Sequence, residues 1–159
     1  MRPNLFLARV LYSNSNNIVN FASRVINQRN LQSMNNQFSP KISEVLIYSK
    51  EEALRLHNEC VAPEHLLLGL IRDGEGKAIQ ILRLLNLDFR SVKLRAEQSI
   101  QGSAMQEMPD ADHEIILNEK ASKIMRLCLL EARMLKAQVA DTEHILLAIM
   151  KEKDNNACR

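Results

Sequence analysis

The feature that most constrains the fold is an internal repeat with a constant offset of 79 residues. Identical residues fall on one another without a gap from Ser43 and Ser122 as far as Ala78 and Ala157. Between these ends the matches are Glu52-Ala53 with Glu131-Ala132, Leu56 with Leu135, Glu64-His65 with Glu143-His144, and Leu67-Leu68 with Leu146-Leu147. Self-similarity at a fixed period is typical of one supersecondary unit used twice. The repeat therefore predicts two copies of the same fold element.

Each copy begins with an amphipathic segment of helical period. Apolar or small residues recur every three or four positions, which places them on one face of a helix. In the first copy they are Ile42, Val45, Ser49, Ala53 and Leu56, and in the second copy Ala121, Ile124, Cys128, Ala132 and Leu135. We expect both stripes, including Cys128, to lie in the core.

A second helix follows in each copy, at Pro63 and at Thr142, residue types suited to a helix start. An acid comes next in both, Glu64 and Glu143, where the positive end of the helix dipole favours a carboxylate. Residues 66–71 and 145–150 are then almost wholly apolar. Each of these helices is predicted to be the buried centre of its repeat.

The rest of the first copy supplies two more helices. Asp73-Gly74-Glu75-Gly76 predicts a turn, and apolar positions predict one helix over Ala78–Leu85 and another over Phe89–Ile100. Residues 101–116 read as a polar linker. The predicted domain thus covers 37–159, with repeat 1 at about 38–100 and repeat 2 at about 117–159. Because the counterpart of Ile100 would lie near position 179, repeat 2 is expected to be incomplete within this sequence.

Composition supports a helical, aliphatic fold. The 159 residues are 46% hydrophobic but only 4% aromatic, without Trp, and contain four Gly and four Pro. Such long stretches without helix breakers favour helices over many short strands. We predict an all-α fold of two tandem four-helix repeats related by a pseudo-twofold axis.

The N-terminal segment differs from the rest. Residues 1–33 contain four Arg and no acid, so 17 of the 21 basic residues remain beside all 19 acidic ones in the predicted domain. Residues 1–36 are interpreted as an N-terminal extension, arising from an upstream start before Met34 or from a transit-like peptide. Because the domain itself is slightly acidic, its charge does not favour a nucleic-acid interface, although the overall pI of about 8.5 keeps a helical nucleic-acid binder as an alternative.

Catalytic and metal motifs are incomplete. His113-Glu114 begins an H-E-x-x-H zinc pattern, but Leu117 stands where the second His is required. Gly69 to Gly74 has phosphate-loop spacing, but Glu75 replaces the Lys. The three cysteines form no C-x-x-C pair and fit a reducing compartment. No apolar run reaches the length of a membrane span, so we predict a non-catalytic chain with no cofactor or metal and no membrane or nucleic-acid partner.

Several motifs together resemble the Clp N-terminal repeat family of the ClpC-type AAA+ chaperones. The first repeat is similar over Phe38-Ser-Pro-Lys-Ile-Ser-Glu-Val-Leu and Pro63-Glu-His-Leu-Leu-Leu-Gly-Leu-Ile, and the second over Thr142-Glu-His-Ile-Leu-Leu-Ala-Ile. The resemblance implies a domain that receives adaptors and unfolded or tagged substrates. It also implies ATPase rings outside this chain, which bind ATP and deliver substrates to the ClpP peptidase. The expected location is the bacterial cytoplasm, or an organelle if residues 1–33 are a transit peptide.

The resemblance also implies a ligand site. In some ClpC proteins the Glu of each E-H motif holds the guanidinium of phosphoarginine, and a hydroxyl near each repeat start lies beside the phosphate. The matching residues are Glu64, Glu143 and Ser39, whereas Asn118 occupies the second hydroxyl position. A purely structural interpretation stays open, in which both acids complement helix starts and His65 and His144 pack or hydrogen-bond in the first turn. A stand-alone accessory subunit of a Clp protease is the alternative function.

Overall fold

The computed structural model describes residues 37–100 and 115–152. These residues belong to one compact unit that begins at Gln37. The elements, in chain order, are α3 (Pro40–Arg55), β1 (Cys60–Val61), α4 (Pro63–Asp73), α5 (Lys77–Leu84), α6 (Phe89–Ile100), β2 (Ile116–Leu117), α7 (Glu119–Met134) and α8 (Thr142–Lys151). The prediction of a helical fold is confirmed, with two short strands in addition. The expectations for residues 1–36, 101–114 and 153–159 fall outside the described residues.

The two long helices begin in the same way. Ser39 caps α3 with a side-chain oxygen that accepts from the Ile42 amide at 3.4 Å. Asn118, at the equivalent place, caps α7 and accepts from the Ala121 amide at 2.8 Å. Each cap satisfies one of the amides that a helix start leaves without an intrahelical partner. Thus the second repeat keeps the helix start while exchanging a hydroxyl for an amide.

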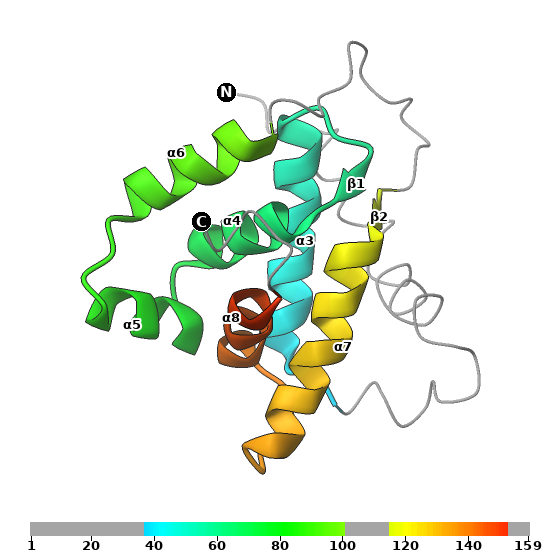
Figure 1. Ribbon diagram of the computed structural model, residues 1–159, viewed down its shortest axis with the longest axis vertical. Coiled ribbons are helices and arrows are strands. Elements are labelled where there is room, and N and C mark those ends of the chain that lie inside the picture. The colour runs from blue at the N-terminus through cyan, green and yellow to red at the C-terminus, as the bar shows by residue number, and fades with distance from the viewer. Residues whose placement is uncertain (1–36, 101–114, 153–159) are drawn as a thin grey trace, which may run out of the picture. The chain divides into compact units, whose positions relative to one another are not determined.

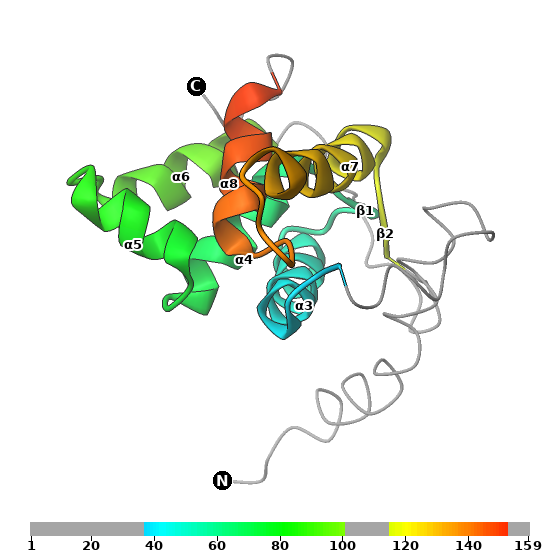
Figure 2. The ribbon, with the colours of Figure 1, turned by 90° about the horizontal axis from the view of Figure 1, so that it is seen from below.

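The helices pack as two hairpin-like pairs, α3 with α4 and α7 with α8. In Figures 1 and 2, α5 and α6 lie on one side of the molecule and β1 and β2 on the other. α6 packs on α4, while α5 packs on α8 of the other repeat. The start of α8 is therefore enclosed by elements from both repeats, which is the arrangement that builds the site described below.

Extended residues cross-connect the repeats. β1, just before α4, pairs in parallel with β2, just before α7. An isolated parallel bridge joins Phe38, just before α3, to Ala140, just before α8. The amide of Asn118 donates to Val61 O at 2.9 Å, and the amide of Ser39 donates to Ala140 O at 2.8 Å. These two bonds exchange places under the 79-residue offset, so the repeats are related as a reciprocal pair.

The core is aliphatic, as expected. The predicted stripes are buried at Ile42, Val45, Ser49, Ala53, Ala121, Ile124, Cys128 and Ala132. The central helices α4 and α8 are buried over most of their length. Three predicted positions are exposed instead: Leu85 (59%), Leu135 (58%) and Met150 (59%). Leu85 and Leu135 are C-cap residues, and Met150 is in the last turn of α8, so all three lie where a helix ends.

The start of the second repeat also departs from a purely helical pattern. Ile115 is buried and Ile116, in the segment expected to be a polar linker, lies in β2. The 3.6-residue helical period does not reveal these residues, because a two-residue strand is too short to show a periodicity of its own. Its partner, β1, is 56 residues away in the sequence.

Candidate functional site

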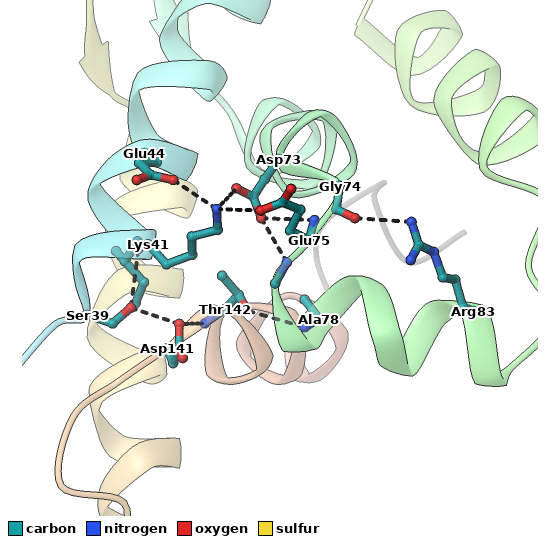
Figure 3. A network of polar contacts seen from close by, with 12 residues as sticks. Ser39, Lys41, Glu44, Asp73, Gly74, Glu75, Ala78, Arg83, Asp141 and Thr142 are labelled. Atoms are coloured by element: carbon teal, nitrogen blue, oxygen red, sulfur yellow. Dashed lines mark hydrogen bonds and ion pairs between the residues drawn. The ribbon is translucent and has the colours of Figure 1, made fainter.

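The candidate site lies at the start of α8, where both repeats meet. Asp141 is the N-cap of α8, and its Oδ1 accepts from the Ser39 hydroxyl at 2.8 Å and from the Thr142 amide at 2.8 Å. Lys77, at the start of α5, places its Nζ 3.0 Å from Glu143 Oε1 and 3.8 Å from Asp141 Oδ2. The hydrogen bond and charge of Glu143 raise the pKa of Lys77. Three helix starts thus converge on one small polar cluster (Figure 3).

Thr142 anchors this cluster in the interior. Thr142 is fully buried, and its Oγ1 accepts from the Ala78 amide at 3.2 Å. A Cβ added at Gly76 would lie 2.6 Å from that Oγ1 and 2.9 Å from Cγ2 of Thr142. The missing side chain at Gly76 therefore lets the start of α5 approach the start of α8. This contact fixes Lys77 beside Glu143.

A second polar cluster holds the turn between α4 and α5 (Figure 3). Lys41 Nζ lies 2.8 Å from Asp73 Oδ1 and 3.0 Å from Glu44 Oε2. Hydrogen bonds to Asp73 and Glu44 raise the pKa of Lys41. The other oxygen of Asp73 accepts from the amides of Gly76 at 3.0 Å and Glu75 at 3.4 Å. Since this turn leads directly into Lys77, the cluster positions α5 against α8.

The two histidines act as caps of the central helices. Nδ1 of His65 accepts from the Ala62 amide at 2.9 Å, and Nδ1 of His144 accepts from the Asp141 amide at 2.9 Å. His65 Nε2 lies 3.1 Å from Asn58 Oδ1, so its Nε2–H donates to that oxygen. Burial lowers the pKa of His65 to about 4. The expectation that both histidines hydrogen-bond in the first helical turn is confirmed.

The two glutamates differ in their surroundings. Glu143 Oε1 pairs with Lys77, whereas Glu143 Oε2 is buried without a hydrogen-bond partner. Glu64 is 7% exposed as a residue, but among the described residues the buried side-chain oxygen without a hydrogen-bond partner belongs to Glu143. A carboxylate oxygen with unused acceptor capacity is suited to binding a cationic donor group.

The structure combines the sequence-derived residues across the repeats. Ser39 of repeat 1 lies with Asp141 and Glu143 of repeat 2, through the hydrogen bond to Asp141 and the ion pairs of Lys77. Glu64 of repeat 1 comes three residues after Val61, whose carbonyl oxygen accepts from the Asn118 amide at the start of α7. Each E-H motif therefore lies near the helix start of the other repeat.

Sequence reasoning missed Lys77, Asp141 and Thr142 as members of this cluster. A signal for Asp141 exists, because Asp is among the strongest N-cap residues and it directly precedes the Thr-Glu-His motif. Lys77 gives no such signal, since it is distant in sequence and only the packing of α5 on α8 brings it near.

Among residues 37–100 and 115–152, no cluster of three His, Cys, Asp or Glu is placed to hold a metal ion. Cys60 and Cys128 are free thiols, and burial raises the pKa of Cys128 to about 12, while Cys158 lies outside the described ranges. None of the helices in these ranges is long and apolar enough to cross a membrane.

The family of the chain follows from its similarity to known proteins. The family model of the Clp repeat (R) N-terminal domain matches residues 37–159. The chain belongs to this family. ClpC/MecB of Bacillus subtilis, a negative regulator of genetic competence, is 37% identical over 123 residues, and the chaperone ClpB of Oceanobacillus iheyensis is 36% identical over 123 residues. Each match covers 77% of this chain and 15% of the relative.

Relatives of the Clp repeat domain also occur in plastids and among solved structures. The chloroplastic ClpC2 of rice is 30% identical over 152 residues, covering 89% of this chain and 16% of the relative. The Hsp104 N-terminal domain from Candida albicans has the same fold, with a TM-score of 0.61 and 16% identity over 74% of this chain and 75% of that chain. Residues 37–159 thus form a Clp repeat N-terminal domain of the Clp/Hsp100 chaperone type, and the match spans about 15% of the length of the ClpC/MecB and ClpB relatives.

Proposed function

We propose that this Clp repeat domain receives unfolded or tagged protein substrates and adaptor proteins, and does no bond chemistry itself. The ATP-driven steps, including delivery to the ClpP peptidase, belong in this proposal to ATPase rings. Two features support it: exposed apolar side chains beside the junction strands, and the acids of the two E-H motifs.

Exposed apolar side chains beside the junction strands carry the proposal. Ile116 in β2 is 51% exposed, and Val139, in the bend just before the Phe38–Ala140 bridge, is 42% exposed. They lie beyond the two ends of α7, each next to a contact that pairs one repeat with the other. Exposed apolar side chains on or beside short extended segments suit an extended peptide, because its backbone can add along a strand edge while its side chains contact the apolar residues.

Binding of a fluorescently labelled unfolded protein, followed by anisotropy, tests this assignment. We expect the double variant Ile116→Thr, Val139→Thr to bind more weakly, since it removes apolar contact and keeps β-branched side chains. The matched control is Leu94→Gln, which removes an equally exposed apolar residue on α6 (54% exposed). If Leu94→Gln weakens binding as much as the double variant does, the junction is not the receiving surface. ATP hydrolysis by the chain alone would contradict the non-catalytic assignment.

A narrower proposal concerns phosphoarginine, with Ser39, Glu64 and Glu143 as contacts. The partnerless oxygen of Glu143 supports a guanidinium partner, because carboxylate–guanidinium hydrogen bonds are strong and directional, and Glu64 is the matching acid at the start of α4. The surroundings of Glu64 and Glu143 differ, however. At Glu143 a guanidinium competes with Lys77, and a phosphate beside Ser39 meets the Asp141 carboxylate. We therefore assign the stronger guanidinium contact to Glu64.

Titration with free phosphoarginine, followed by calorimetry, separates the two halves. We expect Glu64→Gln to lower the affinity more than Glu143→Gln does, and the double variant to abolish binding. Arginine without the phosphate serves as the ligand control. Equal responses from the parent protein and the double variant would show that these acids do not form the site.

A further inference from the structure

A cavity of about 550 Å³ is lined by residues of α3, α4 and α6. Its lining combines an aliphatic floor with charged walls. The residues are Glu52 and Arg55 on α3, Leu68, Ile71 and Arg72 on α4, and Lys93 on α6. The volume lies in the range of small-molecule and side-chain binding sites.

The Glu52 carboxylate holds the two arginines of the cavity in place. This carboxylate is 5% exposed, and each oxygen holds a different arginine: Oε2 accepts from Arg55 at 2.7 and 2.9 Å, and Oε1 accepts from Arg72 at 3.1 Å. Arg72 also pairs with Glu51 at 2.5 Å and lies over the Tyr48 ring at 5.2 Å. The guanidinium groups are therefore held in place before any ligand arrives.

The cations face outward and the acids lie behind them. The side chains of Arg55 and Arg72 are 45% and 42% exposed, whereas those of Glu52, Glu51 and Glu97 are 5%, 18% and 20% exposed. A ligand that enters the cavity thus meets guanidinium N–H groups first. Arg55 pairs with Glu52 and Glu97, and Arg72 pairs with Glu51 and Glu52. The N–H groups that these pairs leave over in each planar guanidinium favour a carboxylate.

Lys93 adds a third positive charge from the opposite wall. It is exposed, and it has no ion pair with the part of the chain that the structure describes. Unlike the arginines, it contributes nothing visible to the fold. A lysine in that position provides charge for a bound anion.

In the second repeat, fewer cations surround the buried glutamate than in the first. Under the 79-residue offset, Arg55 corresponds to Met134, Ile71 to Met150, and the pair Glu52–Arg72 to Glu131–Lys151. Lys151 Nζ keeps the buried bridge, at 2.8 Å from both oxygens of Glu131. One cation therefore satisfies the buried glutamate, and the additional cation at Arg55 has no counterpart in the second repeat, where Met134 takes its place.

We propose that this cavity binds a Glu or Asp side chain of a protein segment, with a flanking aliphatic residue resting on Ile71, the partly exposed apolar residue of the lining. The proposal rests on the protein-receiving function proposed above and adds the chemical class of segment received. Nucleic acid is disfavoured as the occupant, because the floor is aliphatic and the predicted domain has more acidic than basic residues.

The test uses a fluorescently labelled pentapeptide, acetyl-Ala-Leu-Glu-Leu-Ala-amide, with the full chain. We expect replacement of its Glu by Gln to weaken binding about tenfold, as loss of a charge-assisted contact does. We expect Lys93→Gln to weaken binding of the Glu peptide about threefold and to leave the thermal midpoint unchanged. Arg95→Gln, an exposed cation on the same helix, is the matched control and should have no effect. Amide chemical shifts around Leu68 and Ile71 should move on titration.

Three outcomes would overturn the inference: equal affinity for the Glu and Gln peptides, equal effects of Lys93→Gln and Arg95→Gln, or displacement of the peptide by a short single-stranded DNA of comparable affinity. Binding of unfolded protein, measured in parallel, keeps the two proposals apart. If unfolded protein binds and the Glu peptide does not, the cavity assignment fails while the receiving function stands.

Discussion

The buried cap of α4 makes the stability of this domain depend on pH. His65 is 1% exposed, and both ring nitrogens are in use: Nδ1 accepts from the Ala62 amide, and Nε2–H donates to Asn58. Only the neutral ring with its proton on Nε2 can make both bonds. Burial lowers the pKa of His65 from its ordinary value of 6.5 to about 4. Protonation therefore costs the folded state both desolvation and a hydrogen bond.

The direction and size of the effect follow from linkage. Because the folded pKa is depressed, the unfolded chain binds a proton that the folded chain does not between pH 6.5 and about 4. The free energy of unfolding thus falls as the pH falls through this window. One pH unit corresponds to about 1.4 kcal/mol, so His65 contributes a loss of about 3 kcal/mol between pH 7 and pH 4. That is a substantial part of the stability of a small domain.

Urea denaturation at several pH values between 7 and 4 measures this loss, and His65→Gln isolates it. Gln at the third helical position can also accept from the N-cap amide, but it does not titrate. We expect the stability of the parent to fall about 3 kcal/mol further than that of His65→Gln over this range. His57→Gln, which removes an exposed imidazole, is the control. Parallel curves for the parent and His65→Gln, or a His65 NMR titration centred near pH 6.5, would refute the reasoning.

Three further substitutions test the packing of the repeats, each measured by thermal and urea denaturation. Gly69→Ala should destabilise the domain, because the new Cβ would lie 2.3 Å from Ser49 Oγ and 2.7 Å from the Val45 carbonyl oxygen. Overpacking costs about 1–3 kcal/mol, which exceeds the gain in helix propensity of about 1 kcal/mol. A variant as stable as the parent would contradict that close approach. Thr142→Val should cost about 1–3 kcal/mol by leaving the buried Ala78 amide without its acceptor, and an unchanged midpoint would disprove that role. Asn118→Ala should cost about 1 kcal/mol as the loss of an N-cap, whereas Asn118→Asp should retain the stability.

Local sequence signals were sufficient for the elements that repeat. The stripes of α3 and α7 and the apolar runs of α4 and α8 follow from a 3.6-residue period, and they are buried as expected. Helix starts were predictable for the same reason, since Pro63 lies at the first helical position and Thr142 directly follows a capping Asp. These features depend on residues within one or two turns of each other.

The candidate site was predictable only in part. The sequence identified Ser39, Glu64 and Glu143 individually, but it does not specify which repeat start lies beside which E-H motif. That pairing is set by the parallel contacts of β1 with β2 and of Phe38 with Ala140, which join residues 56 and 102 positions apart. Lys77 enters the cluster for the same reason, through the packing of α5 on α8. Long-range register of this kind leaves no trace in local periodicity.

The internal duplication offers a physical way to separate folding roles from binding roles. Where both repeats keep a contact, such as the buried Glu52–Arg72 and Glu131–Lys151 bridges, the fold requires it, because a buried carboxylate without a partner is costly. Where only one repeat has a charged group, as at Arg55 opposite Met134, the fold has been completed without it. The same comparison applies at the junction, where Asp141 stands opposite Ala62 and draws Ser39 and Lys77 toward α8. Differences between equivalent positions should therefore concentrate at the surfaces where the two repeats meet different ligands, and the cavity at Arg55 and the cluster at Asp141 are two such places.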